Sequence, residues 1–343
     1  MPRTGNHEAS DVPRVRLTTA QTTVYTESSS RINSLDVPVL GRSFTSILDL
    51  SPEELAHVLD TALAVKRDGS GPLLAGQTLA LIFEKPSLRT RVSFEVAMSR
   101  LGGRAIYLSD AEVQLGRREP VKDMARVLSR MVDGIAARTF AHETIDELAR
   151  WATVPVVNAL TDDEHPCQAL ADLLTLRERL GTLAGVRLTY LGEGNNVAAS
   201  LAYASVLSGM HFTCVSPDGY GLPESTLARA RALPGGGSVA QSGDPYEAVR
   251  DTAALYTDVW ASMGQEHLLT ARLEAFGPYR LDEALLAEAP AGALVMHDLP
   301  AHRGEEISDG AIESVNSVVF QQAENRLHAQ QAILLLLMGQ AAS

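Results

Sequence analysis

The segment from Phe83 to Arg91 contains the residue types that bind a phosphate group. Ser87 stands where an apolar, strand-like run changes into a segment with helical spacing of apolar residues, so we expect it to cap a helix. The N–H groups at a helix start carry partial positive charge, and Arg89 and the Thr90 hydroxyl add further donors. Taken alone, the segment is equally compatible with an ordinary serine cap followed by solvated arginines.

Apolar, β-rich runs alternate with helical patterns along the chain, which is typical of parallel sheets flanked by helices. Strands are expected near residues 78–84, 104–108, 134–138, 155–160, 186–191, 211–216, 254–260 and 293–297. Helices are expected near residues 52–67, 88–101, 120–131, 142–151, 166–180 and 318–338. The predicted fold class is therefore α/β, with two domains that each contain a parallel sheet flanked by helices.

The order of these elements divides the chain into four segments. We expect a flexible N-terminal extension over 1–40, a first domain over 41–182, a second domain over 183–316, and a C-terminal helix over 317–343 that packs back on the first domain. A cleaved transit segment is an alternative for the extension, although Glu8 and Asp11 argue against it.

Polar residues follow the ends of several predicted strands. They lie at residues 87–90, 138, 165–168, 195–196, 258–263 and 297–300. Ligands of open parallel sheets bind beyond the carboxyl ends of the strands. A structural role can explain any one of these groups, but all of them at one edge predict a binding site.

Composition limits the possible partners. The chain of 343 residues has 29 basic and 42 acidic residues and a net charge of -13, which argues against nonspecific binding to nucleic acid or to an anionic membrane. No apolar run is long enough to span a membrane. Cys167 and Cys214 are too few for a disulfide framework, so we expect a reduced, cytoplasmic setting.

Several motifs together resemble the aspartate/ornithine carbamoyltransferase family, and within it the ornithine enzymes. The resemblance covers residues 41 to 340 and rests on FEKPSLRTRVSFE (83–95), VQLGRREPVKDMARVLSR (113–130), ARTFAHET (137–144), HPCQALADLLTL (165–176), GEGNNVA (192–198), DVWASMGQE (258–266), HDLPAHRGEE (297–306) and ENRLHAQ (324–330). It implies a carbamoyl-phosphate domain joined to an amino-acid domain.

The resemblance implies a set of residues that bind carbamoyl phosphate. They are Ser87, Leu88 (through its main chain), Arg89, Thr90, Gln114, Arg138, His165, Gln168, Leu299 (through its carbonyl) and Arg326. In this set, Arg138 and His165 would donate to the carbonyl oxygen in the manner of an oxyanion hole. Gln168 would bind the amide end. Gln114 would reach the site of a neighbouring subunit, which implies a homotrimer or a multiple of it.

The resemblance also implies an acceptor site, with Asn196, Asp258, Ser262 and Met263 on the α-amino and α-carboxylate groups of an amino acid. The segment Gly192-Glu-Gly194 is also similar to a dinucleotide-binding turn, but the third glycine of that motif is missing. An NAD-dependent oxidoreductase is therefore one alternative from another class.

Asp298 departs from the ornithine enzymes, which have Cys at this position beside the attacking amine. An unperturbed carboxylate, with a reference pKa near 3.9 against about 8.5 for a thiol, is a far weaker base. If burial and like charge in the pocket shared with Asp258 raise one pKa, the enzyme still uses ornithine. Alternatively, the charged side chain selects a shorter diamino acid, such as 2,3-diaminopropionate or 2,4-diaminobutyrate.

The predicted activity is carbamoyl transfer from carbamoyl phosphate to L-ornithine, which yields L-citrulline and phosphate. The implied catalytic residues are Arg89, Arg138, His165 and Asp298. A non-catalytic paralogue that binds the same ligands is a further alternative. No metal ion or organic cofactor is expected, because the electrophile arrives already activated and no cluster has ligand spacing.

Overall fold

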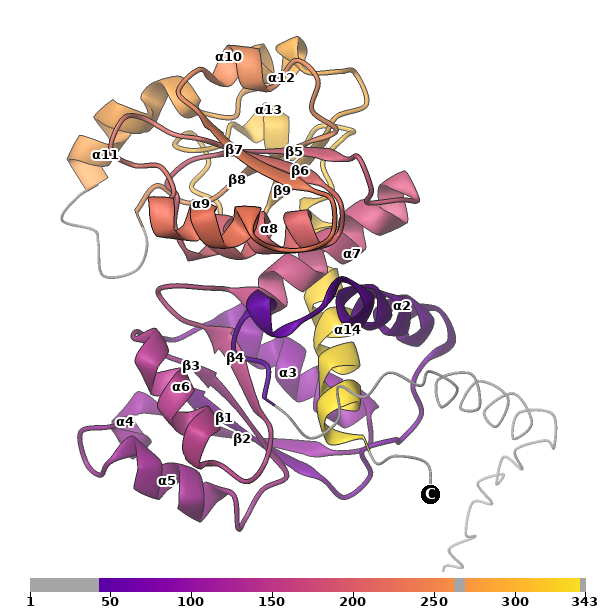
Figure 1. The fold of residues 1–343 in the computed structure, drawn as a ribbon, viewed down its shortest axis with the longest axis vertical. Coiled ribbons are helices and arrows are strands. Elements are labelled where there is room, and N and C mark those ends of the chain that lie inside the picture. Colours follow the sequence, from indigo (N-terminus) through magenta and orange to yellow (C-terminus); the bar gives the residue numbers. More distant parts are fainter. Residues whose placement is uncertain (1–42, 262–268, 340–343) are drawn as a thin grey trace, which may run out of the picture.

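The structure is a computed structural model that describes residues 43–261 and 269–339. The predicted extension over 1–40 lies outside the described residues. The chain forms two parallel sheets, one in each half, with helices on their faces, so the predicted α/β class is confirmed. Figure 1 shows the two sheets one above the other, with a helix from residue 166 onward running between them.

The first sheet has the strand order β2-β1-β3-β4, and all of its pairs are parallel. Its strands are β1 (Thr78–Phe83), β2 (Arg104–Ser109), β3 (Gly134–Arg138) and β4 (Val156–Leu160). Every residue of β1, β3 and β4 is buried, which agrees with their continuous apolar runs, whereas every residue of the edge strand β2 is exposed or half-buried. The helices of this half are η1 (Ile47–Asp49), α2 (Pro52–Asp68), α3 (Leu88–Arg100), α4 (Asp110–Val113), α5 (Val121–Leu128), α6 (His142–Trp151) and α7 (Pro166–Leu180).

The second sheet has the order β7-β6-β5-β8-β9 and is also parallel throughout. Its strands are β5 (Arg187–Leu191), β6 (His211–Val215), β7 (Ser238–Ser242), β8 (Ala254–Thr257) and β9 (Leu294–His297). The helices of this half are α8 (Asn196–Leu207), α9 (Glu224–Arg231), α10 (Pro245–Ala248), α11 (Leu269–Phe276), η3 (Gly277–Tyr279), α12 (Glu283–Glu288) and α13 (Asp309–Ile312), and α14 (Val319–Met338) follows them in the chain.

Three local predictions were wrong. The strand β7 was missed because it is an edge strand in which only Val239 is buried, so it has no apolar signal. The strand predicted over 254–260 ends at Thr257, and directly after it Oδ1 of Asp258 accepts a hydrogen bond from the Val259 N–H at 2.7 Å. The helix predicted over 120–131 ends at Leu128.

The last helix, α14, belongs in space to the first half of the molecule. It packs against α2, α3 and α7, and Figure 1 shows it beside α2 and α3, below the second sheet. Its later turns are apolar and buried, whereas its earlier turns bury Gln322, Asn325 and Arg326. The helix therefore places polar side chains where the two halves meet.

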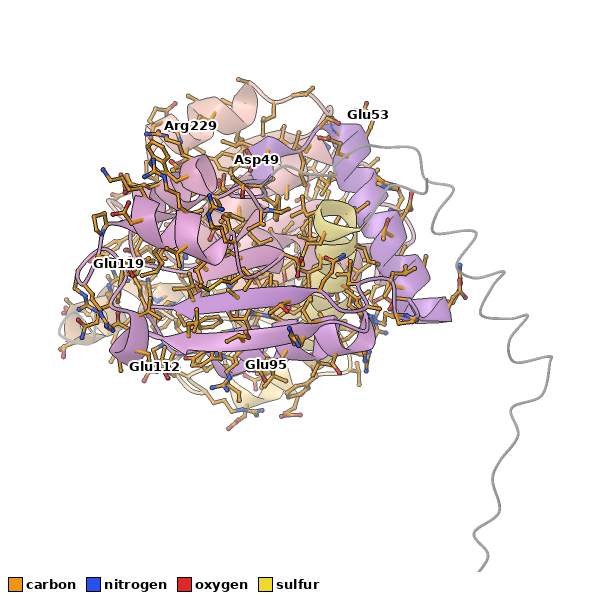
Figure 2. The ribbon with its side chains drawn as sticks, turned by 90° about the horizontal axis from the view of Figure 1, so that it is seen from below. Asp49, Glu53, Glu95, Glu112, Glu119 and Arg229 are labelled. Atoms are coloured by element: carbon orange, nitrogen blue, oxygen red, sulfur yellow. The ribbon has the colours of Figure 1, made fainter. Side chains whose placement is uncertain are left out.

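Charged side chains reach solvent around the first half of the molecule. Figure 2 shows Glu112 and Glu119 at the same edge of this half, on the segment that also contains Gln114. In the described part of the chain, no helix combines the length and the apolar character that crossing a membrane requires.

Candidate active site

The predicted site residues follow the carboxyl ends of the strands in both sheets. The described groups are residues 87–90, 138, 165–168, 195–196, 258–261 and 297–300. Because all strands within each sheet are parallel, each group lies at the same edge of its sheet. The two edges supply the two sides of one candidate site, which the contacts of Arg326 and Asp172 described below connect.

Ser87 and Thr90 form the start of the predicted phosphate site. Ser87 is the N-cap of α3, and its Oγ accepts from the Thr90 N–H at 3.3 Å and donates to Thr90 Oγ1 at 2.9 Å. Thr90 Oγ1 also accepts from Nη2 of Arg326 at 2.6 Å, across 236 positions of the sequence. Leu88 is the first residue of α3 and is 74% exposed.

Three arginines give this region an excess of positive charge. The Nε atoms of Arg89, Arg138 and Arg326 are buried, and none has a hydrogen-bond partner among the described residues. Burial, followed by the charges of Arg326 and Arg89, lowers the pKa of Arg138 to about 10. Burial also lowers the pKa of Arg89 and of Arg326. Cations that are largely buried and have unused donors are costly unless an anion joins them, so the cluster fits a phosphate.

His165 lies beside this cluster as the N-cap residue of α7. Burial, followed by the positive charges of Arg326 and Arg138, holds its pKa well below the usual value. The imidazole is therefore neutral near pH 7, and its buried Nδ1 has no partner in residues 43–261 or 269–339. A neutral imidazole can donate one ring N–H to a carbonyl oxygen that gains negative charge.

Glu164 holds the main chain at His165, and sequence reasoning missed it. This buried carboxylate accepts from Ser46 Oγ, from the Ile47 N–H at 3.1 Å and from Ser200 Oγ at 3.0 Å. Ser200 Oγ in turn accepts from the His165 N–H at 2.9 Å. The acid next to His165 was the available signal, but its partners lie up to 118 positions away.

Gln168 lies on the first turns of α7 and is held at both ends of its amide. Its Oε1 accepts from Nη1 of Arg326 at 2.6 Å, and its Nε2 donates to Oδ1 of Asp172 at 2.7 Å. Asp172 also accepts from Gln322 Nε2 at 2.8 Å and from the Tyr256 hydroxyl at 3.2 Å. Sequence reasoning missed Asp172 because a polar residue within a helix gives no indication that it is buried.

The main chain at Leu299 is fixed by His297 and Glu306. Leu299 has a left-handed φ of 60°, which is uncommon for a residue with a branched side chain. Its N–H donates to Nδ1 of His297 at 2.8 Å, and the other ring nitrogen, Nε2, lies 2.9 Å from Oε1 of Glu306. Both ring nitrogens of His297 are therefore engaged, which fixes the ring beside the main chain of Leu299.

Two acidic residues lie on the acceptor side of the site. Burial, followed by the charge of Asp298, raises the pKa of Asp258 well above its usual value. Burial would also raise the pKa of Asp298, but its contact with His297 and the charge of Arg326 outweigh burial and lower it. The pair therefore holds its proton on Asp258 and its charge on Asp298.

Asn195 and Asn196 begin α8 beside these carboxyl groups. Asn195 caps the helix and donates from Nδ2 to Oδ2 of Asp258 at 2.8 Å. Asn196 Nδ2 donates to the Thr161 carbonyl at 2.6 Å, in the loop that leads to His165. Thus α8 connects the predicted acceptor side with the predicted carbamoyl-phosphate side.

The remaining predicted site residues are Gln114, Ser262 and Met263. Ser262 and Met263 lie outside the described residues. Gln114 is exposed at the end of α4, with a left-handed φ of 48°.

The turn at Gly192 and Gly194 has a packing role. A Cβ on Gly194 would lie 2.2 Å from the main-chain nitrogen of Leu222, so only glycine allows this close approach. The Gly194 N–H also donates to the Tyr220 carbonyl at 2.7 Å. The glycine that suggested a dinucleotide turn is therefore used to pack two loops together.

One group with metal-ligand chemistry occurs in the described part of the chain: His302, Glu305 and Glu306, whose ligand atoms lie within 4.8 Å of one another. Sequence reasoning did not single out this group. Glu306 already contacts His297 and accepts from the His302 N–H at 2.6 Å, so we assign the group a structural role.

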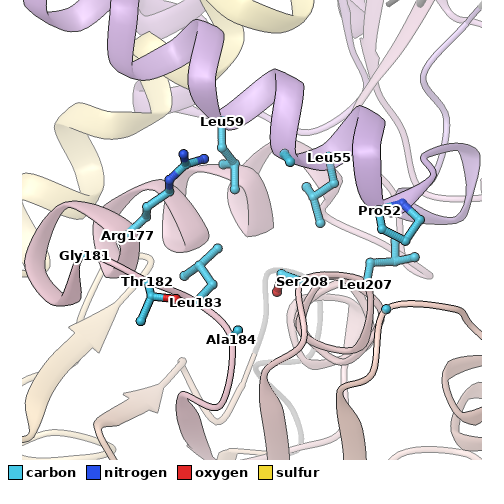
Figure 3. A pocket seen from close by; sticks show the side chains of 12 residues that line it. Pro52, Leu55, Leu59, Arg177, Gly181, Thr182, Leu183, Ala184, Leu207 and Ser208 are labelled. Carbon is cyan, nitrogen blue, oxygen red and sulfur yellow. The ribbon is translucent and has the colours of Figure 1, made fainter.

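A cavity of about 340 Å³ lies apart from the predicted site. It opens between α2 and the segment that follows α7, as Figure 3 shows. Its walls include Leu55, Leu59, Arg177, Leu183, Leu207 and Ser208. Because α7 and α8 reach it with their C-terminal ends, the cavity is separated from the strand ends by the length of both helices.

Two family models match this chain, one over each half. A family model described as "Aspartate/ornithine carbamoyltransferase, carbamoyl-P binding domain" matches residues 42–178, and one described as "Aspartate/ornithine carbamoyltransferase, Asp/Orn binding domain" matches residues 184–337. These matches define the class as a two-domain carbamoyltransferase. The chain belongs to the aspartate/ornithine carbamoyltransferase family.

Three similar proteins align with this chain over almost their whole length. The ornithine carbamoyltransferase of Acidothermus cellulolyticus is 53% identical over 304 residues, which is 88% of this chain and 97% of that protein. That of Anoxybacillus flavithermus is 49% identical over 308 residues, with 88% and 98% covered. The solved structure of the ornithine carbamoyltransferase from Pyrococcus furiosus matches with a TM-score of 0.84 and 47% identity, and covers 88% of this chain and 99% of that one.

The variant Asp172→Asn tests the charge state of this buried carboxyl group. Burial raises the pKa of Asp172 from 3.8 to about 7, so between these values the folded protein binds a proton that the unfolded protein lacks. The free energy of unfolding of the wild type should therefore fall, relative to the variant, as pH rises through this interval, by at most about 1.4 kcal/mol per pH unit. Urea unfolding of both proteins measures this difference.

The control for this experiment is Asp218→Asn, which changes an exposed aspartate. This variant should follow the wild type at every pH. The assignment would be contradicted if Asp172→Asn also followed the wild type.

Proposed function

We propose that this chain transfers the carbamoyl group of carbamoyl phosphate to the side-chain amine of L-ornithine, with L-citrulline and phosphate as products. The observation that carries the proposal is the cluster of buried Arg138 and Arg326 with half-buried Arg89, whose Nε atoms are open donors beside the N-cap of α3. Relatives near 50% identity that are named ornithine carbamoyltransferase support the choice of acceptor.

Each end of carbamoyl phosphate has a group of matching chemistry. Ser87, the N–H groups at the start of α3, and Arg89 suit the phosphate oxygens. Arg138 and neutral His165 suit the carbonyl oxygen, which gains negative charge when the amine attacks the carbon. Oε1 of Gln168 suits the amide, as does the Leu299 carbonyl. The carbon–oxygen bond to phosphate then breaks, and the arginines stabilise the departing anion.

The acceptor must lose a proton, because a protonated amine has no lone pair with which to attack. Asp298 is the ionised carboxylate on this side, and Arg326 is among the charges that lower its pKa. A bound phosphate offsets that attraction, so the pKa of Asp298 rises when carbamoyl phosphate is present. Asp298 is then a better base when both substrates are bound. The second candidate, a shorter diamino acid, is favoured by the same residue because a charged side chain changes the distal pocket.

Gln114 would complete the site of a neighbouring subunit in a homotrimer. Exposed apolar side chains support association: Leu88 and Val92 on α3 are 74% and 48% exposed, and Ile106 on the edge strand β2 is 45% exposed. A cytoplasmic location, as the cysteine content suggests, stays a prediction.

A panel of acceptors tests the proposed substrate. L-Ornithine, 2,4-diaminobutyrate, 2,3-diaminopropionate, putrescine and L-aspartate would be compared by the ureido product formed. Ornithine should have the highest kcat/KM, by about tenfold or more for each missing methylene. Ornithine as the slowest diamino acid would favour the shorter acceptors, and no transfer to any amine would favour a non-catalytic paralogue.

Replacement of Asp298 tests its role as the base. Asp298→Asn should lower kcat with ornithine by about 10²–10⁴-fold, because the amide cannot take the proton, and should leave the KM for carbamoyl phosphate nearly unchanged. Asp218→Asn, which changes an exposed aspartate, is the matched control. If Asp298→Cys turned over ornithine faster than the wild type, Asp298 would instead be a change of specificity.

Hybrid trimers test the position of Gln114. Gln114→Ala and His165→Ala subunits should each be weakly active, but a mixed trimer contains a site with intact His165 from one subunit and intact Gln114 from another. Refolding the two variants together should therefore give more activity than the sum of the two refolded separately. If mixing gave no gain, Gln114 would not act across a subunit boundary.

A further inference from the structure

Asp172 is a buried carboxyl group that the proposed reaction does not use directly. It lies on α7, one turn after Gln168, and is fully shielded from solvent. Its partners come from three elements: Gln168 on α7, Gln322 on α14 and Tyr256 on β8. Burial of a carboxyl group costs free energy even when it is hydrogen-bonded, so we expect Asp172 to have a role in addition to packing.

Asp172 and Arg326 together allow one orientation of the Gln168 amide. Nε2 of Gln168 donates to Oδ1 of Asp172 at 2.7 Å, and Oε1 accepts from Nη1 of Arg326 at 2.6 Å. A flipped amide would place its NH₂ group against a guanidinium, which has only donors, and its oxygen against a carboxyl group that already receives two other hydrogen bonds. The oxygen of Gln168 therefore faces the arginine cluster.

This orientation matters because carbamoyl phosphate differs from an acyl phosphate at one group. Acetyl phosphate has the same phosphate and carbonyl, but a methyl group replaces the NH₂. An amide oxygen accepts a hydrogen bond from NH₂ and gains nothing from a methyl group, whereas an amide NH₂ group would oppose the carbamoyl NH₂.

We propose that Asp172 is a positioning residue that holds the oxygen of the Gln168 amide toward the carbamoyl NH₂, and that the site thereby selects a carbamoyl phosphate over an acyl phosphate. The proposal rests on the function proposed above. It places the selecting contact on Gln168 and the orientation of that contact on Asp172. Gln322 and Tyr256 also donate to Asp172, but neither contacts the Gln168 amide in this arrangement.

Calorimetric binding of three ligands at 25 °C tests the proposal: carbamoyl phosphate, acetyl phosphate and inorganic phosphate. The wild type should bind carbamoyl phosphate about tenfold or more tightly than acetyl phosphate, which corresponds to one hydrogen bond. Asp172→Leu removes the acceptor at similar volume and should bring this ratio close to one. Its affinity for inorganic phosphate should stay near that of the wild type, because phosphate makes no contact with the Gln168 amide.

Two matched variants separate orientation from general loosening. Asp172→Asn keeps an oxygen that can accept from Gln168 and Gln322, so it should keep the preference for carbamoyl phosphate. Tyr256→Phe removes a hydrogen bond to the other oxygen of Asp172 and should also keep it. Gln168→Leu should lose the preference, and adding Asp172→Leu to it should lower the ratio no further.

The outcomes divide clearly. The proposal is overturned if Asp172→Leu keeps the wild-type ratio, if it loses inorganic phosphate binding to the same extent, or if Tyr256→Phe loses the preference as well. If Asp172→Leu does not fold, Asp172→Ala is measured in its place, because water can fill the space beside the three donors. A wild type that binds no carbamoyl phosphate would instead contradict the proposed function itself.

Discussion

The contact of Arg326 with Thr90 and Gln168 is the interaction on which the site depends. Its guanidinium lies between the start of α3 and the start of α7, at 2.6 Å from each partner. It gets there because the apolar turns of α14 pack against α2, α3 and α7. The burial of that helix therefore places Arg326 beside buried Arg138 and half-buried Arg89. The cost of so much unpaired positive charge is what makes the cluster receptive to an anion.

The opposite side of the site, where the acceptor is expected, carries negative charge. Asp298 is ionised and Asp258 holds a proton, because two neighbouring buried carboxyl groups cannot both be charged at low cost. The charge of Asp298 partly balances that of the arginines while the site is free. A phosphate among the arginines changes this balance, so binding on one side alters the basicity of the other. An aspartate at position 298 is then compatible with the chemistry of an amine acceptor.

Much of the candidate site could be located from the sequence because its residues follow strand ends, although their roles stay predictions. Ser87 was identified from a change of periodicity, and its role as N-cap is confirmed. Gln168 and Arg326 could be assigned to the site only through the family resemblance, because a glutamine or an arginine within a helical pattern gives no functional signal by itself. Their direct contact spans 158 positions and could not be read from local spacing.

The buried acids that support the site, Glu164 and Asp172, could not be predicted from the sequence, and one physical reason applies to both. Glu164 and Asp172 are acids, and a sequence pattern places acids at the surface by default. Each is buried by partners from distant segments, as when Gln322 reaches Asp172 across 150 positions. The strand β7 was missed because an edge strand with polar side chains lacks periodicity, although its partner β6 pairs with all five of its residues.

The most direct test of this account is the effect of carbamoyl phosphate on the stability of the full chain with no amino acid present. Urea unfolding at 25 °C would be measured with and without the ligand. If the arginine cluster binds the phosphate group, the free energy of unfolding should rise with ligand concentration. The rise should be about 2.7 kcal/mol when the ligand concentration is a hundred times the dissociation constant. A stability that does not change at any ligand concentration would contradict the account.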